Sequence, residues 1–115
     1  MQESPIFVRT FDLLQWLLPT LQKFPKEQRF ILAERIHHAA FKFYEAITAA
    51  SLSKKKNEHL EQSDIELQKL RLYLRLSHRL QFLSAAQYKH VFELVEEVGR
   101  LLGGWTKKTQ GNTAL

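Results

Sequence analysis

The fold is decided by the segment SAAQYKHVFELVEEVGRLLGGW, residues 84–105. Apolar residues recur in this segment at steps of three and four, which is the spacing of one face of an α-helix. Ser84 precedes the pattern and is a residue type that caps helix N-termini. The helix is therefore predicted to begin near Ser84 and to end near Trp105. Its buried row is expected to be Tyr88, Val91, Val95, Val98, Leu102 and Trp105.

The same spacing predicts three earlier helices, at about residues 5–23, 25–50 and 57–81. Pro19 lies inside the first pattern, and we expect it to kink that helix rather than to end it. The second helix is expected to begin at Pro25 or Lys26, because the residue before a proline avoids the helical region. Helices of similar length joined by short turns pack best as an antiparallel up-down bundle. The predicted fold is an all-α four-helix bundle.

Length and composition limit the class of protein further. A chain of 115 residues makes one domain, which we assign to residues 1–106, followed by a flexible C-terminal tail at residues 107–115. The absence of cysteine excludes disulfides and fits a reducing compartment. No apolar run is long enough to span a bilayer, and residues 1–5 lack the basic region of a secretory signal. We expect a cytoplasmic protein without membrane contact.

The helix predicted at 57–81 is apolar over roughly half of its circumference. Its apolar residues are Leu67, Leu70, Leu72, Tyr73, Leu74, Leu76 and Leu80. This face is wider than one seam of a bundle requires, and the excess predicts self-association into a homo-oligomer. A monomer with a few exposed leucines remains the alternative.

The charge is unevenly placed along the chain. The net charge is +5, with a pI of about 9.6, which favours an anionic partner such as nucleic acid. No Asp or Glu occurs between Leu67 and Phe92, whereas Arg71, Arg75 and Arg79 recur there at every fourth position. These three residues, called the arginine stripe below, are expected to share one side of a helix.

Like charges at this spacing repel, so something has to offset them. Arginine makes bidentate contacts with phosphate, which points to a bound polyanion or an acidic partner. The alternative is a solvated face whose partners lie on other helices, such as Glu45 or Glu93. Because the replacement removes charges that repel each other, replacing Arg71 and Arg75 by Gln is expected to change stability little.

Candidate catalytic patterns are sparse. Glu34 and His37 form one Glu-x-x-His, but di-iron bundles need two such motifs, so we expect no metal. Arg71 and His78 have the spacing of the Arg-His pair of HEPN-type ribonucleases, which keeps a helical ribonuclease as an alternative. No Gly-rich phosphate loop and no Ser/His/Asp set is present. We expect a protein that binds rather than catalyses, with no cofactor and no small-molecule substrate.

Four segments of the chain form a recognisable set: FDLLQWLLP (11–19), FPKEQRF (24–30), LRLYLRL (70–76) and EVGRLLGGW (97–105). In this order and spacing they resemble the accessory variability determinant (Avd) proteins of diversity-generating retroelements. The similarity spans about residues 6–106. The Phe-Pro-Lys-Glu turn also resembles ribosomal intervening-sequence proteins, a related group of four-helix bundles. A bundle of that RNA-binding type is therefore a further alternative.

The resemblance implies a ring-like homopentamer of four-helix bundles. It also implies binding of a reverse transcriptase and of template RNA, in support of error-prone, adenine-directed cDNA synthesis that the protein does not itself catalyse. Arg71 and Arg75 match basic positions of the family and are the implied contacts. The other basic candidates, which are not matched position by position, are Arg79, Arg35, Lys42, Lys54, Lys55 and Lys56.

Overall fold

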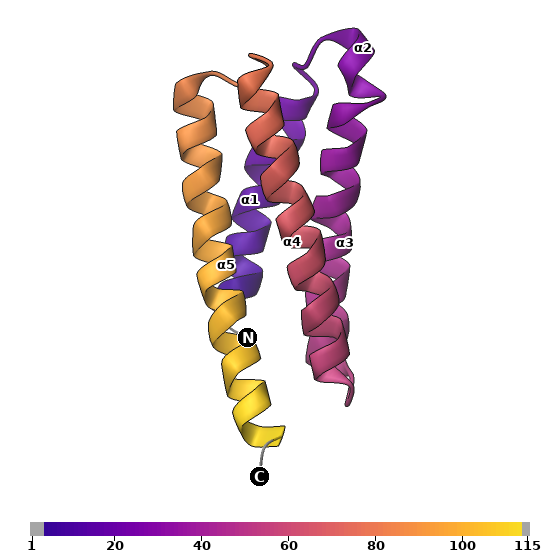
Figure 1. Ribbon diagram of the computed structural model, residues 1–115, viewed down its shortest axis with the longest axis vertical. Coiled ribbons are helices and arrows are strands. Elements are labelled where there is room, and N and C mark those ends of the chain that lie inside the picture. Colours follow the sequence, from indigo (N-terminus) through magenta and orange to yellow (C-terminus); the bar gives the residue numbers. More distant parts are fainter. Residues whose placement is uncertain (1–3, 114–115) are drawn as a thin grey trace.

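The computed structural model describes residues 4–113, which form a bundle of four long helices and one single-turn helix (Figure 1). The helices are α1 (Pro5–Leu21), α2 (Lys26–Arg29), α3 (Leu32–Leu52), α4 (Lys56–Arg79) and α5 (Ala85–Thr113). No strand occurs within residues 4–113. The predicted all-α bundle is confirmed.

The bundle is elongated, with extents of 50 × 26 × 22 Å. Figure 1 shows α3 joined to α4 at one end of the bundle and α4 joined to α5 at the opposite end. α4 packs against both α3 and α5, and α1 packs against α5 and α3. None of the helices in the described range is long and apolar enough to cross a membrane. α4 therefore has a neighbour on either side, and its seam with α5 carries the candidate site.

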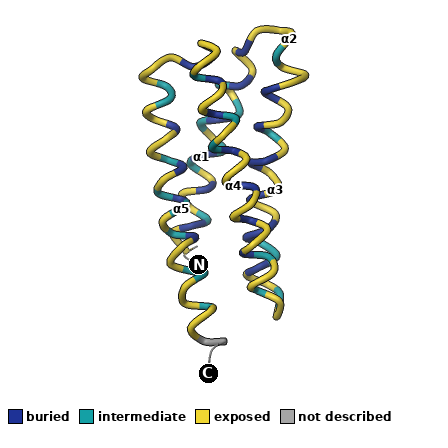
Figure 2. Tube along the Cα trace, in the orientation of Figure 1, coloured by how far each residue is buried: buried dark blue, intermediate teal, exposed yellow. Residues whose placement is uncertain are grey.

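The core runs along the inward faces of all four long helices (Figure 2). Phe24 and Phe43 are the largest of its fully buried side chains. Buried hydroxyls are satisfied inside their own helices, as where Ser77 Oγ donates to the Tyr73 carbonyl at 2.7 Å. The expected row on α5 is buried at Val91, Val95, Val98 and Leu102, and half-buried at Tyr88 and Trp105. Helical periodicity thus identified the core of this helix correctly.

The second predicted helix is wrong as a continuous element. The structure divides it into α2 and α3, with Phe30 and Ile31 between them. Ile31 leaves the helical region at φ −115° and ψ −82°, and both apolar side chains are exposed. The chain reverses direction between α1 and α3 (Figure 1). Within the stretch that was predicted as one helix, the first buried residue is Leu32. The apolar spacing of the sequence continues through this turn, but the apolar side chains of the turn are not buried.

Pro19 lies inside α1 and does not end it, which confirms that part of the expectation, whereas the kink stays a prediction. The helix continues past it to Leu21. Thr20, the next residue, donates its hydroxyl to the Trp16 carbonyl at 2.9 Å. Proline has no backbone N–H, so one intrahelical hydrogen bond is lost while the helix continues on either side.

The turn between α4 and α5 is stabilised by local hydrogen bonds. Gln81 adopts the left-handed conformation, at φ 67°, where glycine is usual, and the Phe82 amide donates to the Ser77 carbonyl at 2.8 Å. Ser84 and Gln87 then cap α5 reciprocally: the Gln87 amide donates to Ser84 Oγ at 3.1 Å, and the Ser84 amide donates to Gln87 Oε1 at 2.9 Å. The predicted N-cap at Ser84 is confirmed.

The predicted end of the last helix is wrong. α5 continues past Trp105 to Thr113, so most of the expected tail is helical, and residues 114–115 lie outside the described range. Gly103 and Gly104 lie inside this helix. Each glycine costs a helix about 1 kcal/mol relative to alanine. The Trp105 ring, 6.4 Å from that of Phe7 on α1, adds tertiary packing beyond the glycine pair.

Candidate nucleic-acid interface

The arginine stripe lies on α4, with its members one helical turn, or about 6 Å of rise, apart. The structure gives these three residues different surroundings. Arg71 and Arg75 line a groove between α4 and α5, and Arg79 is the exposed last residue of α4. The predicted common face is therefore correct in spacing, but its members are not equivalent.

Arg71 is held by α5. Its Nε lies 3.3 Å from Glu96 Oε1, which is an ion-pair distance without hydrogen-bond geometry, and this Nε is buried. The end of the guanidinium rests on Gly99, where an added Cβ would collide with Nη2. The glycine therefore makes room for the arginine. Arg71 is a packing residue of the α4–α5 seam as well as a cation.

This pairing corrects two expectations. The acid that pairs with Arg71 is Glu96, not Glu45 or Glu93, and Glu45 Oε1 instead lies 3.6 Å from Lys42 Nζ. Replacement of Arg71 is thus expected to affect stability, because it removes an interhelical ion pair. Sequence could not reveal the partner, since residues 71 and 96 meet only when the two helices pack.

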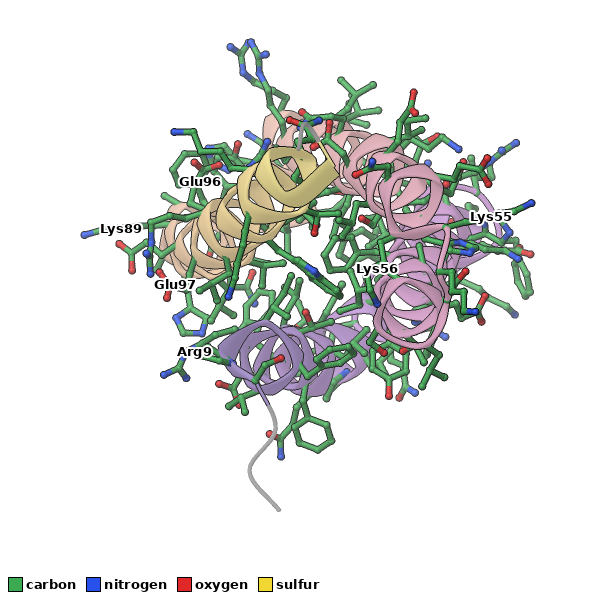
Figure 3. All side chains as sticks on the ribbon, turned by 90° about the horizontal axis from the view of Figure 1, so that it is seen from below. Arg9, Lys55, Lys56, Lys89, Glu96 and Glu97 are labelled. Atoms are coloured by element: carbon green, nitrogen blue, oxygen red, sulfur yellow. The ribbon has the colours of Figure 1, made fainter. Side chains whose placement is uncertain are left out.

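Arg75 and Arg79 are exposed and have no ion-pair partner among residues 4–113. The acidic partners on other helices that were expected for a solvated face are not found at these two residues in the described part of the chain, and both side chains face solvent. Their guanidinium groups are available for an anion in solution. Lys89, on the facing helix α5, is also exposed and projects outward in the end-on view of Figure 3.

The groove beside Arg71 and Arg75, called the upper groove below, has a volume of about 300 Å³. Its walls come from the second half of α4 and the first half of α5. The lining residues are Gln68, Arg71, Leu72, Leu74, Arg75, Tyr88, Phe92 and Val95. It combines an apolar and aromatic floor with guanidinium groups on the α4 side.

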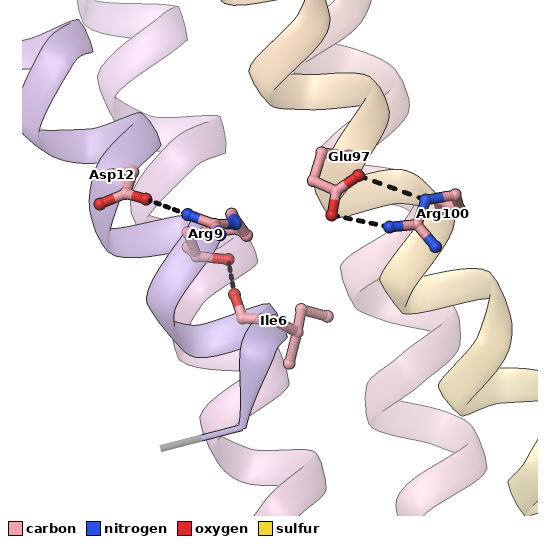
Figure 4. Close-up of polar contacts among 6 residues, drawn as sticks. Ile6, Arg9, Asp12, Glu97 and Arg100 are labelled. Atoms are coloured by element: carbon pink, nitrogen blue, oxygen red, sulfur yellow. Dashed lines mark hydrogen bonds and ion pairs between the residues drawn. The ribbon is translucent and has the colours of Figure 1, made fainter. Parts of the chain in front are cut away.

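An acidic cluster borders the upper groove on α5. Glu93, Glu96 and Glu97 line an adjoining hollow of about 580 Å³, which shares Arg71 and Phe92 with the groove. Arg100 donates to Glu97 at 2.7 Å, and this hydrogen bond lowers the pKa of the Glu97 carboxyl below its usual value (Figure 4). Glu97 therefore stays ionised, and its sign disfavours an anion on that side.

The remaining basic candidates do not join the stripe. Lys54 and Lys55 are exposed in the α3–α4 connection, at the opposite end of α4, about 36 Å from Arg79 along the helix. Lys56 Nζ donates to the Ala50 carbonyl at 2.8 Å and so caps the end of α3. Arg35 and Lys42 are exposed on α3. Lys54, Lys55 and Lys56 therefore do not form one surface with Arg75 and Arg79, which lie at the other end of α4.

The catalytic patterns are not assembled into a site. His78 Nδ1 lies 3.3 Å from the Leu83 carbonyl, and its ring stacks on Tyr88 at a centroid distance of 4.7 Å, whereas Arg71 is engaged at Glu96. The structure therefore ties His78 to the α4–α5 turn and does not pair it with Arg71. Within residues 4–113, no group of three or more His, Cys, Asp or Glu side chains could hold a metal ion.

Two features were missed by sequence reasoning. Phe92 is 49% exposed in the groove, and the signal was available, because it lies outside the row formed by Val91 and Val95. Glu66 is a buried carboxylate, 3% exposed, paired with Lys69 Nζ at 3.1 Å and with Gln62 Nε2 at 3.2 Å. The sequence shows no sign of this burial, because an acidic residue with polar neighbours on its own helix looks like part of an exposed face. Glu66 is buried only when the other helices pack against α4.

The architecture is that of a small all-α bundle. The chain belongs to the bAvd-like family, whose model matches residues 6–109. This match confirms the resemblance to Avd proteins over nearly the whole described bundle. A comparison with curated proteins gives no match.

Proposed function

We propose that this protein is a non-enzymatic accessory factor of a diversity-generating retroelement, which binds the reverse transcriptase and its template RNA and supports mutagenic cDNA synthesis. The observation that carries the proposal is the surface of Arg75 and Arg79 on a member of the bAvd-like family. Those guanidinium groups lack acidic partners among the described residues and suit phosphate contacts. The proposal assigns the complex to the cytoplasm, the compartment expected from the sequence.

The functional test is reconstitution with the reverse transcriptase and template RNA of the same retroelement. We expect the protein to co-purify with the transcriptase and to be required for cDNA that carries errors at template adenines. Arg75→Gln/Arg79→Gln should impair this synthesis. Lys23→Gln/Lys26→Gln, which removes the same charge from exposed positions around α2, should not. Full cDNA synthesis without the protein, or an unaffected Arg75/Arg79 variant, would contradict the proposal.

The proposal includes an antiparallel bundle that assembles as a ring-like homopentamer. Its support is the apolar surface left uncovered on the single chain outside the upper groove: Phe11 on α1 is 61% exposed, and Leu76 and Leu80 at the end of α4 are 43% and 49% exposed. Sedimentation equilibrium at micromolar concentration tests it. We expect a mass five times that of the 13.6 kDa chain, and a stable monomer at that concentration would count against it.

A further inference from the structure

The floor of the upper groove is aromatic and continues toward the α4–α5 turn. Phe92 and Tyr88 lie with ring centroids 6.1 Å apart, and Tyr88 in turn stacks on His78 with the ring planes 4° apart. Phe92 is the half-exposed end of this series and lines the groove. An exposed aromatic face is a platform on which another flat ring can stack.

The charges around this platform favour an anionic ligand on one side only. Arg75 lines the groove and Arg79 follows one turn later, whereas Glu93 and Glu96 border the opposite side. A polyanion would therefore be held along the α4 side and kept away from the lower part of α5. A ligand that combines a flat ring with repeated negative charges could stack on the aromatic floor and contact the arginines at the same time.

We propose that the upper groove receives an unpaired base of single-stranded RNA, stacked on Phe92, while the neighbouring phosphates contact Arg75 and Arg79. This inference rests on the proposed function, because it specifies which form of RNA the same surface takes. Bases inside a duplex are already stacked and paired, so they cannot enter. Stacking tolerates any base, which predicts preference for single strands without strong sequence preference.

The size of the groove favours a base over a docked protein helix. Its volume of about 300 Å³ is at the lower end of the ~300–1,000 Å³ of small-ligand pockets. A helix would need a longer trough for several anchors spaced by turns. An acidic helix would also meet Glu93, Glu96 and Glu97 at the adjoining border. A single base needs only one ring-sized space, and its phosphates can lie on the α4 side, away from these carboxylates.

The test is fluorescence anisotropy of the full chain with a short oligoadenylate, the same strand with abasic sites, and a duplex of equal length. Phe92→Leu removes the ring but keeps an apolar side chain. Phe41→Leu on α3 is the matched control, since Phe41 is 42% exposed and lies outside the groove. Phe92→Tyr, which keeps a ring, should retain binding, and circular dichroism should show that all variants remain helical.

We expect Phe92→Leu to weaken oligoadenylate binding at least about five-fold, the lower end of the effect of one aromatic stacking platform. Phe41→Leu should have no effect. The abasic strand should bind the wild type more weakly than oligoadenylate does. The two strands should bind Phe92→Leu with about the same affinity, because that variant has no ring on which a base could stack. The salt dependence of binding should be unchanged by Phe92→Leu, since no charge is removed.

Two results overturn the inference and leave the proposed function standing. One is that Phe92→Leu binds oligoadenylate as well as Phe41→Leu does. The other is that Phe92→Leu affects only capture of the reverse transcriptase, which would make the groove a protein-docking site. If the wild type binds none of the three nucleic acids, both the inference and the RNA-binding part of the proposed function fail.

Discussion

The two ends of the arginine stripe differ in what faces them. At Arg71, α5 supplies a carboxylate from Glu96 and a bare backbone at Gly99, so the guanidinium packs against the seam with its Nε buried. At Arg75 and Arg79, the exposed side chains meet no acid in the described part of the chain. The same residue type at the same helical spacing thus packs at one end and remains available for an anion at the other.

The difference shows that a charge pattern on one helix has to be interpreted together with its neighbour. The helix repeat determines which residues share a face, but the facing helix determines whether a charge is neutralised. Here the acids on α5 begin at Glu93, beside Arg71, and are absent from its first two turns. The upper part of the seam is therefore the part that can attract a polyanion.

The largest expected effect on stability comes from filling the space at Gly99. Gly99→Val should place its side chain against Leu67 and the end of Arg71; because the arginine end is flexible and can move aside, we expect the low end of the cost of overpacking, about 1 kcal/mol. Gly103→Val is the matched control, because a Cβ built there meets no described atom within 4 Å. Chemical denaturation of both variants should show the destabilisation at Gly99 only. Equal stability would mean that Arg71 does not depend on the glycine.

A smaller difference should separate two neighbouring arginines. Arg71→Gln removes the interhelical pair with Glu96 and should lower the free energy of unfolding by up to about 1 kcal/mol, the upper range for partly exposed pairs. Arg75→Gln should stay within about 0.5 kcal/mol of the wild type, as expected for an exposed position. Thermal or urea unfolding measures both. The comparison fails if Arg75→Gln is the more destabilised.

The smallest effect concerns the acidic border. Because the pKa of Glu97 is lowered in the fold by Arg100, its ionised form adds stability above the ordinary carboxyl pKa of 4.5, and this stability is lost as the pH falls through the lowered pKa. Wild type and Glu97→Gln should therefore differ slightly at neutral pH and converge in acid. Arg100→Gln should show the same convergence. A difference that grows on acidification would contradict the assigned sign.

Much of the fold follows from the sequence, because helical periodicity directly reflects burial. The α5 row and the Ser84 cap were identified in this way, since each depends on residues within one helix. The break at Phe30 and Ile31 and the extension to Thr113 were missed. Both depend on where the chain meets other helices, and apolar spacing alone contains no such information.

The site was predictable only in part, for the same reason. Spacing placed the arginine stripe on one face, but Glu96 and Gly99 approach Arg71 only in the packed bundle. The upper groove depends on Phe92, whose position outside the buried row was the one sequence signal for it. Lys56 looked like a free cation, yet it caps α3 through the Ala50 carbonyl.

The most direct test of the central claim is the salt dependence of single-stranded RNA binding by the Arg75→Gln/Arg79→Gln and Arg71→Gln variants. If the open arginines bind phosphates, the double variant should bind RNA more weakly. The slope of log affinity against log salt should become shallower by about 0.7 for each phosphate that the variant no longer neutralises. Arg71→Gln should keep the wild-type slope, because its guanidinium is already paired with Glu96. An unchanged slope for the double variant, or an equal reduction for Arg71→Gln, would contradict the account.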